Sequence, residues 1–144
     1  MSVVFLVGVD CSACGERALD YAAERAKARD GRLVVAHIIE WSPYSFNTPQ
    51  DNEERHRRRE EEIRSARAEI IDPITQRLRA EGVEAEGVVR HGHAADTLAA
   101  LAEECGATNI VVGHHGMSRL RARVFGSVAS TLVQIADRPV TVVP

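Results

Sequence analysis

The sequence lacks the features that mark secreted, membrane-spanning and nucleic-acid-binding proteins. Its three cysteines are an odd and small number, unlike the cysteine set of a disulfide-stapled domain. No apolar run approaches the roughly 20 residues that a membrane helix needs, and the first residues lack the basic start and cleavage site of a secretory signal. The formal net charge of -3 gives no sign of the basic face that nucleic acids require. These absences predict a cytoplasmic protein with no nucleic-acid or membrane partner.

Two common phosphate-binding loops are absent as well. The chain has neither the Gly-x4-Gly-Lys-Ser/Thr loop of P-loop enzymes nor a Gly-x-Gly-x-x-Gly run after a strand. No second acidic residue is placed to hold magnesium, and no general base is directed at a γ-phosphate. A rapid ATPase or a kinase is therefore not expected, and we assign no catalytic residue and no metal ligand.

What the chain does have is an alternation of two apolar patterns over its 144 residues. Short runs rich in β-branched residues predict strands at residues 3–9, 33–39, 83–89, 110–112 and 139–143. Glu84 and Glu86 interrupt the third run, so we expect this strand at an edge of the sheet, with one face in water.

Between these strands, apolar residues recur with the 3.6-residue period of amphipathic helices. Gly31, Gly82 and Gly106 each follow a helical pattern, at the place where a left-handed C-cap is wanted. Pro73 is expected to kink or split the long helix before the third strand. The order β-α-β-α-β-α-β-α-β predicts a parallel sheet with helices on both faces, in a single domain over residues 1–144.

In such a sheet, ligands bind beyond the carboxyl ends of the strands, where the strand order reverses. The informative segment there is Gly113-His114-His115-Gly116, followed after nine further residues by Gly126-Ser127. Glycines at a strand end let the backbone turn tightly and approach a ligand. The first amides of the helix that starts at Gly126-Ser127 lack intrahelical partners and lie at the positive end of its dipole. A phosphate suits this place, with the Ser127 hydroxyl as an added donor.

The spacing Gly113-x2-Gly116-x9-Gly126-Ser127 resembles the nucleotide-binding signature of the ATP-binding universal stress proteins, and the similarity covers essentially the whole chain. Residues 7–12 resemble the first strand of that family with its aspartate turn, and residues 89–92 resemble the end of the third. The resemblance implies an α/β fold with a five-stranded parallel sheet in the order 3-2-1-4-5, helices on both faces and a nucleotide between strands 1 and 4. This is the Rossmann-type fold of the adenine nucleotide alpha hydrolases.

The resemblance also implies a set of ligand contacts. The nucleoside is expected against Val9, Asp10, Ile38 and Val112. The ribose and phosphates are expected at Gly113, His115, Gly116, Gly126, Ser127 and Val128. ATP is the implied ligand; ADP or AMP, bound Mg²⁺, and slow hydrolysis or autophosphorylation at Ser127 or Ser118 are left open.

By the same resemblance, the chain is expected to be a stress-response regulator, a nucleotide-dependent switch or scaffold for protein partners that the sequence does not identify. A homodimer through the last strand, Val140 to Val143, is also implied. Three positions depart from the family's usual pattern: Thr108 and Asn109 stand where an aspartate and an apolar residue are usual, and Ala94 where a proline is common. None of them lies in the phosphate motif.

Two other functions stay open. Cys11 and Cys14 form a C-x-x-C spacing at a strand-to-helix turn, where a helix N-terminus favours the thiolate, so a thiol-based redox sensor is one alternative. Two cysteines that serve only as small residues would explain the same spacing. The other alternative is an interaction module whose pocket is unused.

Overall fold

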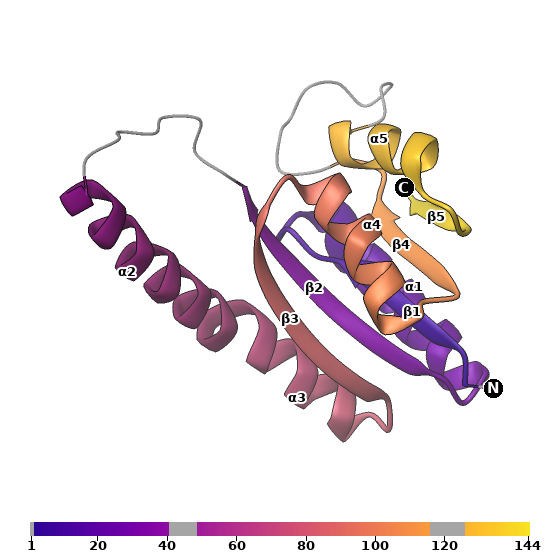
Figure 1. Cartoon of the computed structure of the whole chain (residues 1–144). Helices are drawn as coiled ribbons and strands as arrows, with labels where there is room; N and C mark the ends of the chain where they lie inside the picture. Colours follow the sequence, from indigo (N-terminus) through magenta and orange to yellow (C-terminus); the bar gives the residue numbers. More distant parts are fainter. Residues whose placement is uncertain (1, 41–48, 116–125) are drawn as a thin grey trace.

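The computed structural model describes residues 2–40, 49–115 and 126–144, and of residues 49–52 the backbone alone. Strands and helices alternate along these residues in the order that the sequence predicts (Figure 1). The elements are β1 (Val4–Gly8), α1 (Ala13–Ala28), β2 (Arg32–Glu40), α2 (Pro49–Ala66), the π-helical turn η1 (Arg67–Ile71), α3 (Asp72–Ala80), β3 (Glu84–Gly92), α4 (Ala94–Cys105), β4 (Asn109–Gly113), α5 (Ser127–Ile135) and β5 (Val140–Val143). In the described part of the chain, no helix is both long and apolar enough to cross a membrane.

The five strands form one parallel sheet in the order β3-β2-β1-β4-β5. The expected order 3-2-1-4-5 is therefore confirmed. β3 lies at one edge, as predicted, and the side chains of Glu84 and Glu86 are exposed there. The central strand β1 aligns its Val7 with Val35 of β2 and with Val111 of β4. All three valines are fully buried, because helices cover both faces of the sheet at this point.

Two apolar cores fill the spaces between the sheet and its helices. One core joins the sheet to α1, η1 and α3 and includes Leu19, Ile71 and Leu78. The other joins the opposite face to α4 and α5 and includes Leu98 and Leu132. Figure 1 shows α4 in front of the strands and α1 behind them. Burial of each of these side chains stabilises the fold by about 1.5–3 kcal/mol. The two packed cores therefore hold the strand ends in fixed positions.

Pro73 neither splits the long helix nor ends it. The helix passes from α2 into η1, where the Asp72 amide donates to the carbonyl of Arg67, five residues earlier, and then continues as α3. Pro73 lies in the first turn of α3, where its missing N–H is least costly. The wider π turn lets the chain pass the proline without a break, and Ile71 at its end is fully buried.

Of the three predicted glycine C-caps, two are confirmed. Gly82 and Gly106 have φ of +88° and +65°. At the end of α1 the prediction was wrong, because Asp30 has the left-handed conformation, with φ of +51°, and Gly31 does not. Gly31 is needed for space instead, since a Cβ there would lie 2.5 Å from the carbonyl oxygen of Val3.

Candidate functional site at the carboxyl ends of β1 and β4

The carboxyl ends of β1 and β4 lie side by side in the middle of the sheet. From β1 the chain continues into α1 on one face of the sheet, and after β4 the next described helix, α5, lies on the other face. The strand order therefore reverses between these two strands, and ligands of open parallel sheets bind outside the strand ends at such a point. The residues that the sequence singles out lie along this edge.

The turn after β1 presents the carboxylate of Asp10. Its Oδ1 accepts hydrogen bonds from the backbone amide of Ser12, at 3.0 Å, and from the Ser12 hydroxyl. Ser12 is the N-cap of α1, and its Oγ accepts from the amide of Gly15 at 2.9 Å. Cys11, between them, has φ of +66°, a conformation that few residues other than glycine adopt. Because a carboxylate has about four acceptor positions, Asp10 keeps capacity for a ligand hydroxyl or amino group.

The start of α5 is tied to the end of β4. The amide of Gly126 donates to the carbonyl of His114 at 2.9 Å, and the first helical bond runs from Ser130 to Gly126. No side chain caps this end of the helix. The amides of residues 127–129 therefore have no partner within the helix, and they lie at the positive end of its dipole. The two described ends of the glycine motif thus meet at a place suited to a phosphate group.

Gly113 gives room to the start of α1. A Cβ at Gly113 would lie 2.9 Å from the Cβ of Cys14, so only glycine allows this close packing. The Cys14 sulfur lies 2.9 Å from a guanidinium nitrogen of Arg17 and 4.0 Å from Nδ1 of His115. Arg17 Nε also donates to the carbonyl of Pro144 at 2.7 Å. The start of α1, the end of β4 and the residue after β5 therefore form one connected cluster beside the site.

The apolar residues expected around the nucleoside lie on two faces of the sheet. Val112 is buried in the core beneath α4 and α5, and Ile38 and Val128 pack against it from partly buried positions. Val9 is buried in the opposite core, and its carbonyl lies 2.8 Å from Nδ1 of His37. Val9 and Val112 are 7% and 3% exposed, so they form the floor of the site rather than free walls.

A cavity of about 230 Å³ opens beside the Asp10 turn, between α1 and the η1–α3 helix. Val9 and Cys11 line it, but none of the described residues of the phosphate motif does. In the described ranges, no three histidine, cysteine or acidic side chains are grouped so that they could hold a metal ion.

Nine of the ten predicted site residues are described, and Gly116 lies outside the described residues. Ser12, Arg17 and His37 also make contacts beside the site and are not among the predicted ligand contacts. A serine two residues after an aspartate and just before a helix is a recognisable N-cap signal. Arg17 and His37 give no such signal, because their partners, Pro144 and Val9, lie 127 and 28 residues away in the chain.

The family model and the relatives found by sequence comparison name the same family. The model of the universal stress protein family matches residues 1–144. Universal stress protein YxiE of Bacillus subtilis is 27% identical, over 96% of this chain and 96% of its own length. Universal stress protein A homolog 1 of Coxiella burnetii is 32% identical, over 91% of this chain and 88% of its own length. The chain spans about half the length (47%) of the mycobacterial relatives that it matches, such as universal stress protein Rv1996 of Mycobacterium tuberculosis, at 26% identity.

Solved structures share the fold. Universal stress protein UspA of Lactobacillus plantarum superposes with a TM-score of 0.83, at 20% identity, over 99% of this chain and 97% of its own. The Archaeoglobus fulgidus universal stress protein in complex with dAMP has a TM-score of 0.65 and 24% identity, over 100% of this chain and 98% of its own. A universal stress protein in complex with cAMP has a TM-score of 0.66 and 23% identity, over 99% of this chain and 97% of its own.

Proposed function

The chain belongs to the universal stress protein family, and we propose that its 144 residues form one domain that binds an adenine nucleotide, ATP first among them. The nucleotide would occupy the carboxyl ends of β1 and β4. Its occupancy would set a surface that protein partners read, so that the protein acts as a switch or scaffold in the stress response. The observation that carries the proposal is the bond from Gly126 to His114, beside three amides at the start of α5 that have no partner within the helix.

Each part of the nucleotide has a fitting group at this edge of the sheet. The phosphates would lie on the amides at the start of α5, with the Ser127 hydroxyl and His115 as further contacts. The Asp10 carboxylate would accept hydrogen bonds from the ribose or the adenine amino group, with Ile38 and the strand ends as the apolar floor. The dAMP and cAMP complexes of two similar structures support the adenine nucleotide class. Mg²⁺ would be carried in by the ligand's own phosphates.

The first test is to denature freshly purified protein and identify any released nucleotide by mass spectrometry. Titration calorimetry with Mg²⁺·ATP, ADP and AMP follows on the emptied protein. A nucleotide close to one per chain, or ATP binding in the micromolar range, about -8 kcal/mol, supports the proposal. A protein that is isolated empty and ignores all three ligands would instead be an interaction module with an unused pocket.

Gly126→Leu tests the assigned site. Gly126 has φ of -59° and ψ of 155°, which any residue adopts, so the substitution leaves the backbone unstrained. The introduced leucine side chain would project into the space at the start of α5. We expect ATP affinity to fall at least tenfold while the far-UV circular dichroism spectrum is unchanged. Thr131→Leu, at an exposed position of the same helix, is the matched control and should bind as the parent does. Parental affinity in a folded Gly126→Leu protein would contradict the site.

We further propose a homodimer through β5. This strand is an edge of the sheet, and its four residues are partly exposed. Val133 and Ile135, on the neighbouring α5, are 55% and 45% exposed, which is unusual for large apolar side chains and typical of an interface.

A thiol-based sensor is the second candidate, because Cys14 contacts both Arg17 and His115 while Cys11 is exposed. Oxidation by a peroxide would join the two sulfurs, with two electrons and two protons passing to the peroxide, which gives two waters from hydrogen peroxide or one alcohol and one water from an alkyl hydroperoxide. Non-reducing peptide mapping after peroxide treatment detects the bond. A Cys11→Ser/Cys14→Ser protein that keeps the parent's oxidation-dependent change in ATP affinity or oligomeric state would exclude this role.

A further inference from the structure

A second cavity, of about 290 Å³, lies at the opposite end of the sheet. It opens at the amino ends of three strands: Val3 precedes β1, Asn109 begins β4 and Pro139 precedes β5. The remaining lining residues are Phe5, Tyr21, Arg25, Arg29, Thr108 and Thr141. None of the residues of the candidate nucleotide site lines this cavity, so it is a separate feature of the molecule.

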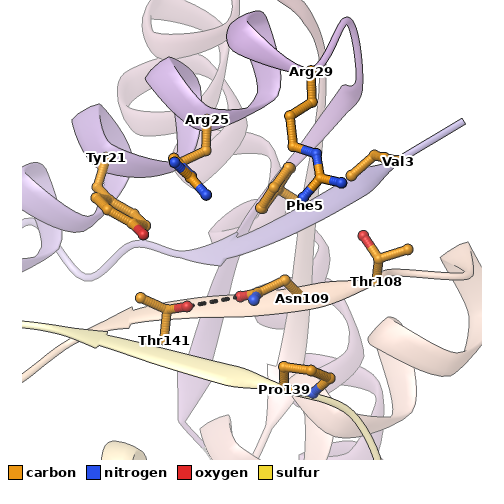
Figure 2. Close-up of a pocket in the computed structure, with 9 residues that line it drawn as sticks. All are labelled: Val3, Phe5, Tyr21, Arg25, Arg29, Thr108, Asn109, Pro139 and Thr141. Carbon is orange, nitrogen blue, oxygen red and sulfur yellow. Dashed lines mark hydrogen bonds between the residues drawn. The ribbon is translucent and has the colours of Figure 1, made fainter.

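One wall of this cavity is cationic. Figure 2 shows the side chains of Tyr21 and Arg25 of α1, and of Arg29 just after it, pointing toward the strands. No lining residue is acidic. Arg25 lies 6.0 Å from the ring centre of Tyr21, and Arg29 has no ion-pair partner in the described part of the chain. Two guanidinium groups and a phenol thus face the same small space without a carboxylate to neutralise them.

The opposite wall combines hydrogen-bond donors with an apolar floor. Thr141 Oγ1 donates to Asn109 Oδ1 at 3.0 Å, which leaves the Nδ2 group of Asn109 as a donor (Figure 2). Val3, Phe5 and Pro139 supply the apolar surface between these polar groups.

We propose that this cavity binds a small organic anion with a flat apolar body, of the aryl carboxylate or aryl phosphate class. The guanidinium groups of Arg25 and Arg29 take the anionic group, in the fork geometry that suits carboxylate and phosphate oxygens. The ring lies on Phe5 and Pro139, and the volume limits the ligand to about one ring. The cavity shares no lining residue with the proposed nucleotide site.

The test follows the arginine Nε–H signals of isotope-labelled full-length protein by NMR during titration with benzoate and phenyl phosphate. Benzamide, the neutral analogue of benzoate, and inorganic phosphate, which lacks a ring, are the ligand controls. We expect the two aryl anions to shift the signals of Arg25 and Arg29 with millimolar or tighter affinity. Both controls should bind at least about tenfold more weakly, which corresponds to one charge-assisted hydrogen bond or one buried ring.

Substitutions separate this site from general attraction of anions. Arg25→Gln and Arg29→Gln should each weaken benzoate binding about tenfold, and Arg64→Gln, at an exposed position of α2, should leave it unchanged. No aryl anion response at Arg25 or Arg29 would overturn the proposal, and so would equal binding of benzoate and benzamide. Equal binding of inorganic phosphate and phenyl phosphate would overturn the assigned ligand class.

Discussion

The three cysteines are surrounded in three different ways. Cys11 is exposed and has the left-handed backbone conformation in the turn after Asp10. Cys14 is partly buried, and its sulfur contacts Arg17. Cys105 lies near the end of α4, where burial raises the pKa of its thiol against the opposing effects of the Ala107 backbone and the Arg32 charge. Because the thiolate is the reactive form, these surroundings separate the cysteines chemically.

We therefore expect Cys11 to react first with a thiol-alkylating reagent and Cys105 last. The raised pKa leaves less thiolate at Cys105 at any given pH, and partial burial limits access to it. Timed alkylation followed by peptide mass spectrometry measures the three rates. Cys105 labelled faster than Cys11 in the native protein would contradict this order.

At the scale of elements, the side chain of Arg138 joins α4 to the start of β5. Its Nη1 donates to the carbonyls of Ala102 and Ala107, at 2.7 and 2.9 Å, and its Nε donates to Asp137. The hydrogen bond and charge of Arg138 lower the pKa of the Asp137 carboxyl. A carboxyl with a lowered pKa stabilises the fold above its unfolded pKa and loses that contribution as the pH falls. This pair therefore favours the fold at neutral pH and not in acid.

Arg138→Met should lower the free energy of unfolding by about 1–3 kcal/mol, because two carbonyls lose a charged donor. Asp137→Asn is the matched control, since its carboxylate is exposed and its loss removes only a surface ion pair. Urea unfolding of both proteins at neutral pH measures the difference. An Arg138→Met protein as stable as Asp137→Asn would show that the link is dispensable.

The π turn fits against β3 at a single glycine. A Cβ at Gly87 would overlap Cγ2 of Ile71, which is fully buried at the end of η1. Gly87→Ala should therefore destabilise the protein by about 1–3 kcal/mol through overpacking. Ile71→Ala removes the overlapping methyl, so the double variant should be more stable than the sum of the two single changes predicts. Strict additivity in urea unfolding would place the strain elsewhere.

At the scale of the whole molecule, much of the fold could be predicted from the sequence. The strands are buried apolar runs, and the glutamates at 84 and 86 mark an edge, so strand positions and the β3 edge follow from local chemistry. The sheet order came from the resemblance to a known family. Gly31 was misread because its role depends on the close approach of Val3, which precedes β1 and is separated from Gly31 in the chain by β1 and α1. The π turn beside Pro73 has no sequence signal.

The candidate site could be predicted only in part, for a similar reason. The glycine motif and Asp10 are local signals, but the packing of Gly113 against Cys14 and the bond from Arg17 to Pro144 join distant parts of the chain. The burial of Val9 and Val112 in cores on opposite faces of the sheet also depends on helices far from them in the chain, while their contacts with a ligand stay a prediction.

The proposed dimer makes a prediction for β5. The amides of Ile110 in β4 and of His114 just after it donate to the carbonyls of residues 139 and 143, so the amide of Val142 points away from β4. Val142→Pro removes this outward donor and should yield a folded monomer, whereas Val142→Ala keeps the donor and should remain a dimer. Sedimentation equilibrium distinguishes the two masses. A dimeric Val142→Pro protein would exclude pairing through this edge.

β4 connects the two proposed ligand sites. Asn109 at its start lines the cationic cavity and Gly113 at its end belongs to the nucleotide motif, about 13 Å apart along the strand. Its three central residues are almost fully buried, so the strand shifts as a rigid rod or not at all. We therefore expect an occupant that displaces one end of β4 to displace the other end as well. Thermodynamic linkage then requires reciprocity: whatever factor an aryl anion imposes on ATP affinity, ATP must impose on the anion.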